Sequence, residues 1–179
     1  WQILPEEIKT DFVGQGLKGQ ILLQKNLAEE ALPLLQKFYL HAPNYRNAFF
    51  VSKALKDQRK YDESITFLQK HQLQNGESLL GNLQIAELAI HAGNNSIAIN
   101  QYKKALAEDK SNIRALNNLA SLLIDEKDYV AALVYAKTAV DLQPKSATIL
   151  DTYASALFKK GNLKEAVKYF EKAYKANPE

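Results

Sequence analysis

The sequence repeats itself about every 34 residues, and this period constrains the fold more than any other feature. Five successive segments share the pattern: 12–44, 45–78, 79–112, 113–146 and 147–179. The last segment carries Tyr153, Ala154, Gly161, Ala166, Phe170 and Ala173. The segment before it carries, at the same offsets, Leu119, Ala120, Lys127, Ala132, Ala136 and Ala139. A period of this length is typical of arrays in which one small unit is repeated and stacked on its neighbours.

The repeated residues predict two helices and a turn in each segment. In the last segment Ala154 and Ala166 are small, which lets two helices approach closely, and apolar residues around them recur at i and i+4. Gly161, like Gly93 in the third segment, suits the left-handed residue that ends a first helix. Pro144 comes where the second helix of the fourth segment must stop. One such helix pair cannot bury its apolar face alone, so the pairs are expected to stack.

Period and residue pattern together resemble the tetratricopeptide repeat family over residues 12–179. The resemblance implies an all-α fold, namely a right-handed superhelical solenoid of about five helix–turn–helix repeats. We expect a single repeat domain, 1–179, in which 1–11 is the end of a preceding helix. The first two copies depart most from the pattern. In the second copy His71 takes a position that a small residue usually holds, and we expect it to be packed and hydrogen bonded.

The resemblance also implies a function, because the first helix of each repeat lines a concave groove in this family. We therefore expect a non-catalytic scaffold that binds a peptide or a partner protein. Carrying the groove positions over repeat by repeat gives the candidate binding residues. They are Arg46, Phe49, Phe50, Lys53, Gln84, Glu87, His91, Arg114, Asn117, Asn118, Ser121, Asp151, Thr152, Ser155 and Lys159.

Two parts of this set stand out. Phe49 and Phe50 are adjacent, so both cannot point into the same core. Either one of them is presented to the groove or a neighbouring repeat, or both pack between repeats. Asn117 and Asn118 form a polar strip with neighbouring residues, and an asparagine amide can both donate to and accept from a peptide backbone.

One known binding mode of the family is not expected here. Some members clamp the C-terminal carboxylate of a chaperone peptide with Lys, Asn and Arg side chains. In this sequence Leu83 and Glu87 replace the first Lys and Asn, and Thr148 and Thr152 replace the last Lys and Arg. We therefore do not expect this chain to clamp a chaperone tail.

No arrangement of residues indicates catalysis, a cofactor or a metal site. The sequence has no cysteine, which excludes disulfides, thiolate nucleophiles and Cys-ligated metals. The three histidines, His41, His71 and His91, show no metal-ligand spacing. The glycine-rich stretch 14–19 lacks the spacing and the preceding strand of a nucleotide-binding loop. We expect neither an enzyme nor a bound cofactor.

Charge and hydropathy limit the classes of partner that this chain is expected to bind. The formal net charge is +3, and the lysines are interleaved with acidic residues, so no nucleic-acid-binding arm is indicated. No apolar run is long enough for a transmembrane segment. The sequence contains no Met, which predicts a fragment or a processed chain. Since terminal repeats usually need a polar cap, we expect either that more protein follows the last repeat or that this edge meets another molecule, for example by self-association through the terminal repeat.

A second resemblance suggests a cellular setting. The stretches Leu116–Ala120, Ala136–Ala139 and Leu150–Tyr153, followed by Phe158–Asn162, resemble bacterial repeat lipoproteins of exopolysaccharide export or envelope assembly. The alternative function is thus a structural spacer within a longer protein of such a system. This resemblance favours the periplasm or the cell envelope over the cytoplasm.

Overall fold

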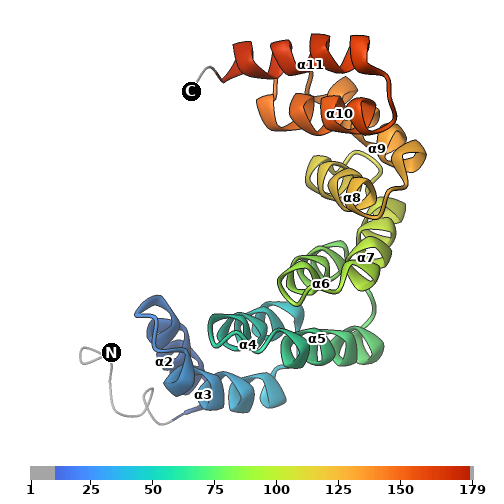
Figure 1. Cartoon of the computed structure of the whole chain (residues 1–179). Coiled ribbons are helices and arrows are strands. Elements are labelled where there is room, and N and C mark those ends of the chain that lie inside the picture. Colours follow the sequence, from blue (N-terminus) through green and yellow to red (C-terminus); the bar gives the residue numbers. More distant parts are fainter. Residues whose placement is uncertain (1–10, 178–179) are drawn as a thin grey trace. The chain divides into compact units, whose positions relative to one another are not determined.

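The computed structural model describes residues 11–177, and all regular secondary structure in that range is helical (Figure 1). This confirms the all-α prediction. The helices are α2 (Phe12–Gln24), α3 (Ala28–His41), α4 (Tyr45–Asp57), α5 (Tyr61–Asn75), α6 (Leu79–His91), α7 (Asn95–Glu108), α8 (Ile113–Asp125), α9 (Tyr129–Leu142), α10 (Ala147–Lys159) and α11 (Leu163–Ala176). The segment expected to end a preceding helix falls almost wholly outside the described residues.

The helices group into two compact units, which are described separately. The N-terminal unit extends up to Asn94 and contains α2 to α6, and the C-terminal unit begins at Asn95 and contains α7 to α11. Within each unit every helix packs on the next one in the chain. The division falls inside the third repeat, 79–112, so the single domain expected from the sequence stays a prediction.

Each first helix begins after a residue suited to cap it. Asp11, Asn44, Ser78, Asn112 and Ser146 directly precede α2, α4, α6, α8 and α10. In the first four of these helices the side chain accepts a hydrogen bond from the backbone amide three residues on. Such caps satisfy amides that have no partner inside the helix, and they explain why the first helices start in register with the repeat.

Each first helix is also followed, two residues after its last residue, by a residue in the left-handed region. The φ angles are positive at Asn26, Arg59, Gly93, Lys127 and Gly161. The left-handed conformation expected of the two glycines is confirmed. Asparagine also tolerates this conformation, but at Arg59 and Lys127 the backbone adopts it although the residue type does not favour it, so the repeat imposes the turn there.

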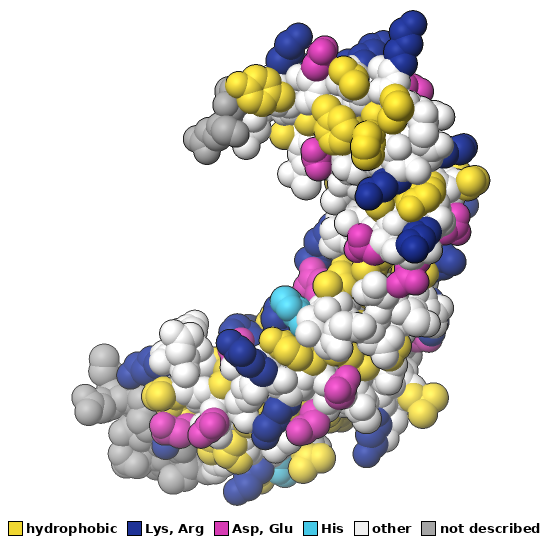
Figure 2. Space-filling view, in the orientation of Figure 1, with side chains coloured by type: hydrophobic (Ala, Val, Ile, Leu, Met, Phe, Trp, Pro, Cys, Tyr) yellow, Lys and Arg dark blue, Asp and Glu magenta, His cyan; other side chains and the backbone are white. Residues whose placement is uncertain are grey.

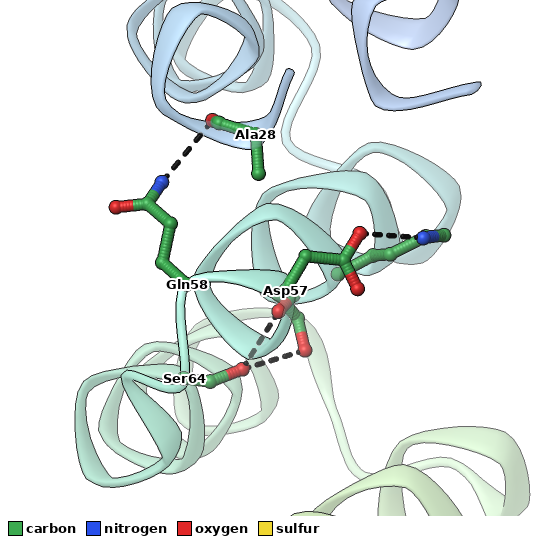
Figure 3. Close-up of polar contacts among 6 residues, drawn as sticks. Ala28, Asp57, Gln58 and Ser64 are labelled. Atoms are coloured by element: carbon green, nitrogen blue, oxygen red, sulfur yellow. Dashed lines mark hydrogen bonds and ion pairs between the residues drawn. The ribbon is translucent and has the colours of Figure 1, made fainter. Parts of the chain in front are cut away.

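The small residues lie where two helices meet. Ala154 and Ala166 are fully buried in the last hairpin. In the second hairpin their places are taken by Ser52 and Ser64, whose hydroxyl groups lie 2.8 Å apart, and the Ser64 hydroxyl also lies 3.0 Å from the Ser52 carbonyl oxygen. Figure 3 shows this contact. Close helix packing is therefore retained in the second repeat, but a buried polar pair replaces the alanines.

His71 is packed and hydrogen bonded, as expected. The side chain is only 4% exposed, and its Nδ1 lies 2.8 Å from the Tyr39 hydroxyl oxygen. The Asn75 amide nitrogen lies 3.2 Å from the same Nδ1. Burial lowers the pKa of His71, because the charged imidazolium is the form that loses most from leaving water. The histidine thus joins α3 to α5 as part of the core of the N-terminal unit.

Candidate functional site

The predicted binding residues fall on the first helices of both units. In the N-terminal unit, α4 carries Arg46, Phe49, Phe50 and Lys53, and α6 carries Gln84, Glu87 and His91. In the C-terminal unit, α8 carries Arg114, Asn117, Asn118 and Ser121, and α10 carries Asp151, Thr152, Ser155 and Lys159. Each set is considered within its own unit.

A cavity of about 220 Å³ lies between α4 and α6. Its lining consists of Phe49, Lys53, Lys56, Asp57, Gln84, Glu87 and Leu88. Four of the predicted residues are thus brought together around one concavity. The lining is mixed, with an aromatic ring and aliphatic stems beside two bases and two acids, and it could hold one side chain of a bound polypeptide.

Phe49 is the apolar feature of this cavity. Its side chain is 40% exposed, and its ring meets the half-buried ring of Phe50 edge-on at 5.7 Å between centroids. Edge-on aromatic pairs are favourable, so Phe50 supports Phe49 from one side. Phe49 is thus the more exposed of the two adjacent rings.

The polar residues around Phe49 are partly engaged inside the unit. The Lys53 Nζ lies 2.6 Å from a carboxylate oxygen of Asp57, one helical turn along α4. Figure 3 shows this pair beside Gln58, whose amide donates to the Ala28 carbonyl oxygen. Gln84 accepts from the Tyr45 hydroxyl at 3.1 Å and donates to the Ser52 hydroxyl at 2.9 Å. Gln84 therefore holds α6 against α4, and its amide is already in use.

Arg46 borders a second cavity, of about 310 Å³, on the other side of α4. The residues that line it are Val13, Leu17, Gln20, Phe38, Ala42, Asn44, Arg46 and Asn47. Val13 is 55% exposed and Leu17 is 40% exposed. Arg46 thus lies beside an exposed aliphatic surface of α2. With the cavity between α4 and α6, α4 has a concavity on each side.

His91 is exposed at the end of α6, where its ring stacks on Tyr61 at 5.4 Å. It does not line the cavity between α4 and α6. The structure therefore places His91 apart from Phe49 and Lys53.

In the C-terminal unit the predicted residues form polar strips on α8 and α10. Asn118 donates to the Tyr102 hydroxyl at 2.9 Å, and the Thr152 hydroxyl donates to the Thr148 carbonyl oxygen at 3.0 Å. The side-chain oxygen of Asn117 is buried and has no hydrogen-bond partner. Two of the predicted polar groups are therefore engaged by the fold itself.

The remaining residues of these strips are more open. Arg114, Ser121 and Lys159 are exposed, and Ser155 is half-buried. Asp151 borders a cavity of about 420 Å³ between α10 and α11, which none of the other predicted residues lines. Beside Lys159 on α10 the ring of Phe158 is 53% exposed, so this unit presents an aromatic side chain as well.

No three His, Asp or Glu side chains between residues 11 and 177 lie close enough together to hold a metal ion. Over the same range no helix has both the length and the apolar character needed to cross a membrane.

Comparison with known proteins identifies the architecture. Residues 21–179 match the family described as "Tetratricopeptide repeat". The chain belongs to the tetratricopeptide repeat family. Among solved structures, MamA (41-end) from Desulfovibrio magneticus RS-1 is similar, with 16% identity, 97% of each chain covered and a TM-score of 0.83. Another MamA crystal structure shows 19% identity over 97% of this chain and 94% of that chain, with a TM-score of 0.81.

A third similar structure is YrrB, described as a TPR protein with an unusual peptide-binding site. It shares 16% identity, covers 97% of this chain and 90% of its own, and has a TM-score of 0.79. No curated protein sequence matches the chain significantly. At these identities the likeness to solved structures shows a shared tetratricopeptide fold.

The tetratricopeptide pattern also places three cavity-lining residues that the candidate binding set did not include. Val13, Leu17 and Gln20 occupy the second, sixth and ninth positions of the first repeat. In the family these positions line the groove, but the looser pattern of the first repeat hides them in the sequence. Counting positions within the first repeat from Phe12 would have identified these three residues.

Proposed function

We propose that the N-terminal unit binds an extended segment of a partner protein along the first helices α2, α4 and α6. The observation that carries this proposal is the exposed ring of Phe49 at the cavity between α4 and α6, with Arg46 at the cavity on the other side of the same helix. Aromatic and arginine side chains are the residue types that dominate binding energy at protein interfaces.

The charges indicate what such a segment contains. Asp57 offsets the charge of Lys53 in the cavity between α4 and α6. In the cavity between α2 and α4, Arg46 is the charged residue of the lining, beside Val13 and Leu17. Arg46 and Phe49 are three residues apart on α4, so their Cβ atoms are about 5–6 Å apart. An extended chain advances about 3.3 Å per residue. The preferred segment therefore carries an apolar residue against Phe49 and an acidic residue farther along, against Arg46.

The comparisons support the general role. Family membership is consistent with a protein-interaction scaffold, and YrrB is a member of the same fold that has a peptide-binding site. We infer a non-catalytic role for this chain on the same grounds, since the cavities of the N-terminal unit offer contact surfaces and no reactive cluster.

Selection from a displayed library of random peptides tests the proposal. The affinity of a selected peptide is measured by fluorescence anisotropy for the wild type, Phe49→Ala, Arg46→Ala and the control Leu73→Ala, whose side chain is 87% exposed on α5. Phe49→Ala is expected to weaken binding at least tenfold, or about 1.4 kcal/mol. Selected peptides should carry both an apolar and an acidic residue. Equal affinities of all four proteins would refute the proposal.

The alternative role, a spacer within a longer protein of bacterial polysaccharide export or envelope assembly, stays a proposal based on the short sequence resemblance around Leu116–Ala120. A periplasmic or envelope location belongs to the same proposal. Replacing Phe49 and Arg46 separates the two roles, because a spacer keeps its activity in the cell when these side chains are removed.

A further inference from the structure

The second helices of the first two repeats border a cavity that the proposed peptide-binding surface does not include. This cavity lies between α3 and α5 and has a volume of about 430 Å³. Its lining comes from Gln36, Tyr39 and Leu40 of α3 and from Phe67, Lys70, His71 and Gln74 of α5. Both helices belong to the N-terminal unit. A volume of this size lies within the range of about 300–1,000 Å³ that is usual for small-molecule sites.

Tyr39 and His71 form the buried part of the lining. Their side chains are 9% and 4% exposed, and the Tyr39 hydroxyl oxygen lies 2.8 Å from Nδ1 of His71. At the repeat position of His71 the three following repeats carry Ala105, Ala139 and Ala173, all of them buried. An alanine brings no polar group to this position, so the second repeat differs from the later ones by placing an imidazole there.

The hydrogen bonds of His71 determine which ring nitrogen a ligand can use. The Asn75 amide nitrogen lies 3.2 Å from Nδ1 and 3.0 Å from the His71 carbonyl oxygen, a group that can only accept. The Asn75 nitrogen is therefore a donor, so Nδ1 accepts and the Tyr39 hydroxyl donates to it as well. Burial lowers the pKa of His71, which favours the neutral ring, and its proton then resides on Nε2. The Nε2–H group is thus the donor that His71 offers at the cavity.

Aromatic and aliphatic side chains form the walls of the cavity. The ring of Phe67 meets the ring of Tyr39 edge-on, with 5.0 Å between centroids and an interplanar angle of 67°. Leu40 is 77% exposed beside them. Two rings held at this angle offer both a face and an edge, and a further aromatic ring packs favourably on either.

The polar part of the lining contains donors and no acidic side chain. Lys70 carries the positive charge, and the amides of Gln36 and Gln74 are exposed with it at the rim. On the face drawn in Figure 2, basic and apolar side chains lie next to each other over α3 and α5, with acidic ones between them. Glu63 and Glu77 flank the lining part of α5 in sequence, and neither lines the cavity. The charge of the lining therefore favours an anionic group.

We propose that the cavity between α3 and α5 binds a small aromatic carboxylate. The ring of the ligand packs against Phe67 and Tyr39, and its carboxylate accepts hydrogen bonds from Nε2 of His71 and from Lys70. A cationic ligand would meet Lys70 without an acidic partner, and an uncharged apolar one would cover the His71 donor without pairing it. The site lies on second helices and is independent of the peptide-binding surface on α2, α4 and α6.

Titration with 4-phenylbutyrate and with its uncharged amide, 4-phenylbutyramide, tests this inference by NMR. The acid is expected to bind with a Kd on the order of 1 mM or tighter, as is usual for a ligand of this size. The amide should bind at least about fivefold more weakly, because it loses the charge-assisted hydrogen bonds. In ring-nitrogen spectra of the histidines, Nε2 of His71 should be the nitrogen that shifts with the acid, while the signals of His41 and His91 stay unchanged.

Substitutions at the rim separate charge from general surface effects. Lys70→Gln removes the cation, and Gln74→Glu places a carboxylate beside the ligand, so each should weaken binding of 4-phenylbutyrate at least about threefold. Lys60→Gln is the matched control, since it removes the same charge from an exposed position outside the cavity. Phe49→Ala should also leave this binding unchanged. All of the rim and control residues other than Phe49 are fully on the exposed surface, and circular dichroism checks that the helices persist.

Three results would overturn the inference. They are equal binding of the acid and the amide, no binding of either, and a loss with Lys60→Gln that equals the loss with Lys70→Gln. A blocked tripeptide that ends in phenylalanine with a free carboxylate is the further arm. If this tripeptide binds and 4-phenylbutyrate does not, the cavity accepts the C-terminus of a polypeptide, and the proposal of a free small carboxylate is wrong.

Discussion

Replacing Lys127 by glycine should stabilise the C-terminal unit. Lys127 ends α8 with a φ of 64°, a conformation that costs a side-chain-bearing residue about 1–2 kcal/mol relative to the right-handed form. Glycine avoids this cost, but it loses about 0.5–1 kcal/mol more conformational entropy on folding. The turn itself is kept, because the backbone amides of Lys127 and Asp128 donate to carbonyl groups of α8. The expected net gain is about 0.5–1 kcal/mol.

Thermal or urea unfolding monitored by circular dichroism measures this gain. A gain of about 1 kcal/mol corresponds to a rise of about 2–4 °C in Tm for a chain of this size. Lys127→Ala is the control, because it removes the same exposed side chain and keeps the strain. The reverse change at the equivalent position, Gly161→Ala, should destabilise by a similar amount, since its φ is 92° and no atom crowds the added Cβ. The reasoning fails if the Gly and Ala variants of Lys127 are equally stable.

Three further changes probe the interior. Burial lowers the pKa of His71, so below the ordinary histidine pKa of about 6.5 the unfolded chain binds more protons than the folded chain. Urea titrations should therefore show the free energy of unfolding falling from pH 7 to pH 5, by at most about 1.4 kcal/mol per pH unit through this group. His71→Gln should flatten that slope. Ser64→Ala should cost about 1–3 kcal/mol by leaving Ser52 without its hydroxyl partner, whereas replacing both serines by Ala should cost less than the sum of the single changes. Tyr102→Ala should cost about 3–5 kcal/mol in denaturant unfolding, since this ring is fully buried, and a cost below about 1 kcal/mol would contradict the packing described.

The helical hairpins could be predicted from the sequence because their determinants are local and repeated. Ala154 and Ala166 show where two helices meet, and Gly161 shows where the first one ends. Lys127 and Arg59 adopt the same left-handed turn, although neither residue type indicates it. Only their position within the repeat predicts this turn at Lys127 and Arg59. A periodic sequence therefore predicts backbone conformations that the preferences of single residue types do not.

The binding surface was harder to predict because it depends on contacts between repeats. Gln84 and Asn118 hold groove positions, yet each amide is engaged by a residue of another helix, Tyr45 for Gln84 and Tyr102 for Asn118. Such pairings join positions far apart in sequence and follow no periodic rule. The relative exposure of Phe49 and Phe50 likewise depends on how α4 packs on its neighbours, which two adjacent phenylalanines in a sequence do not reveal.

Hydrogen exchange of the chain with and without a library-selected peptide tests the proposed function most directly. Binding along the first helices of the N-terminal unit predicts slowed exchange in α4 and α6, around Phe49 and Gln84, and unchanged exchange in α11. The second helices α3 and α5 border a separate cavity of about 430 Å³ around Tyr39, and they serve as the internal reference. Slowed exchange confined to α3 and α5, or to α11, would contradict the account.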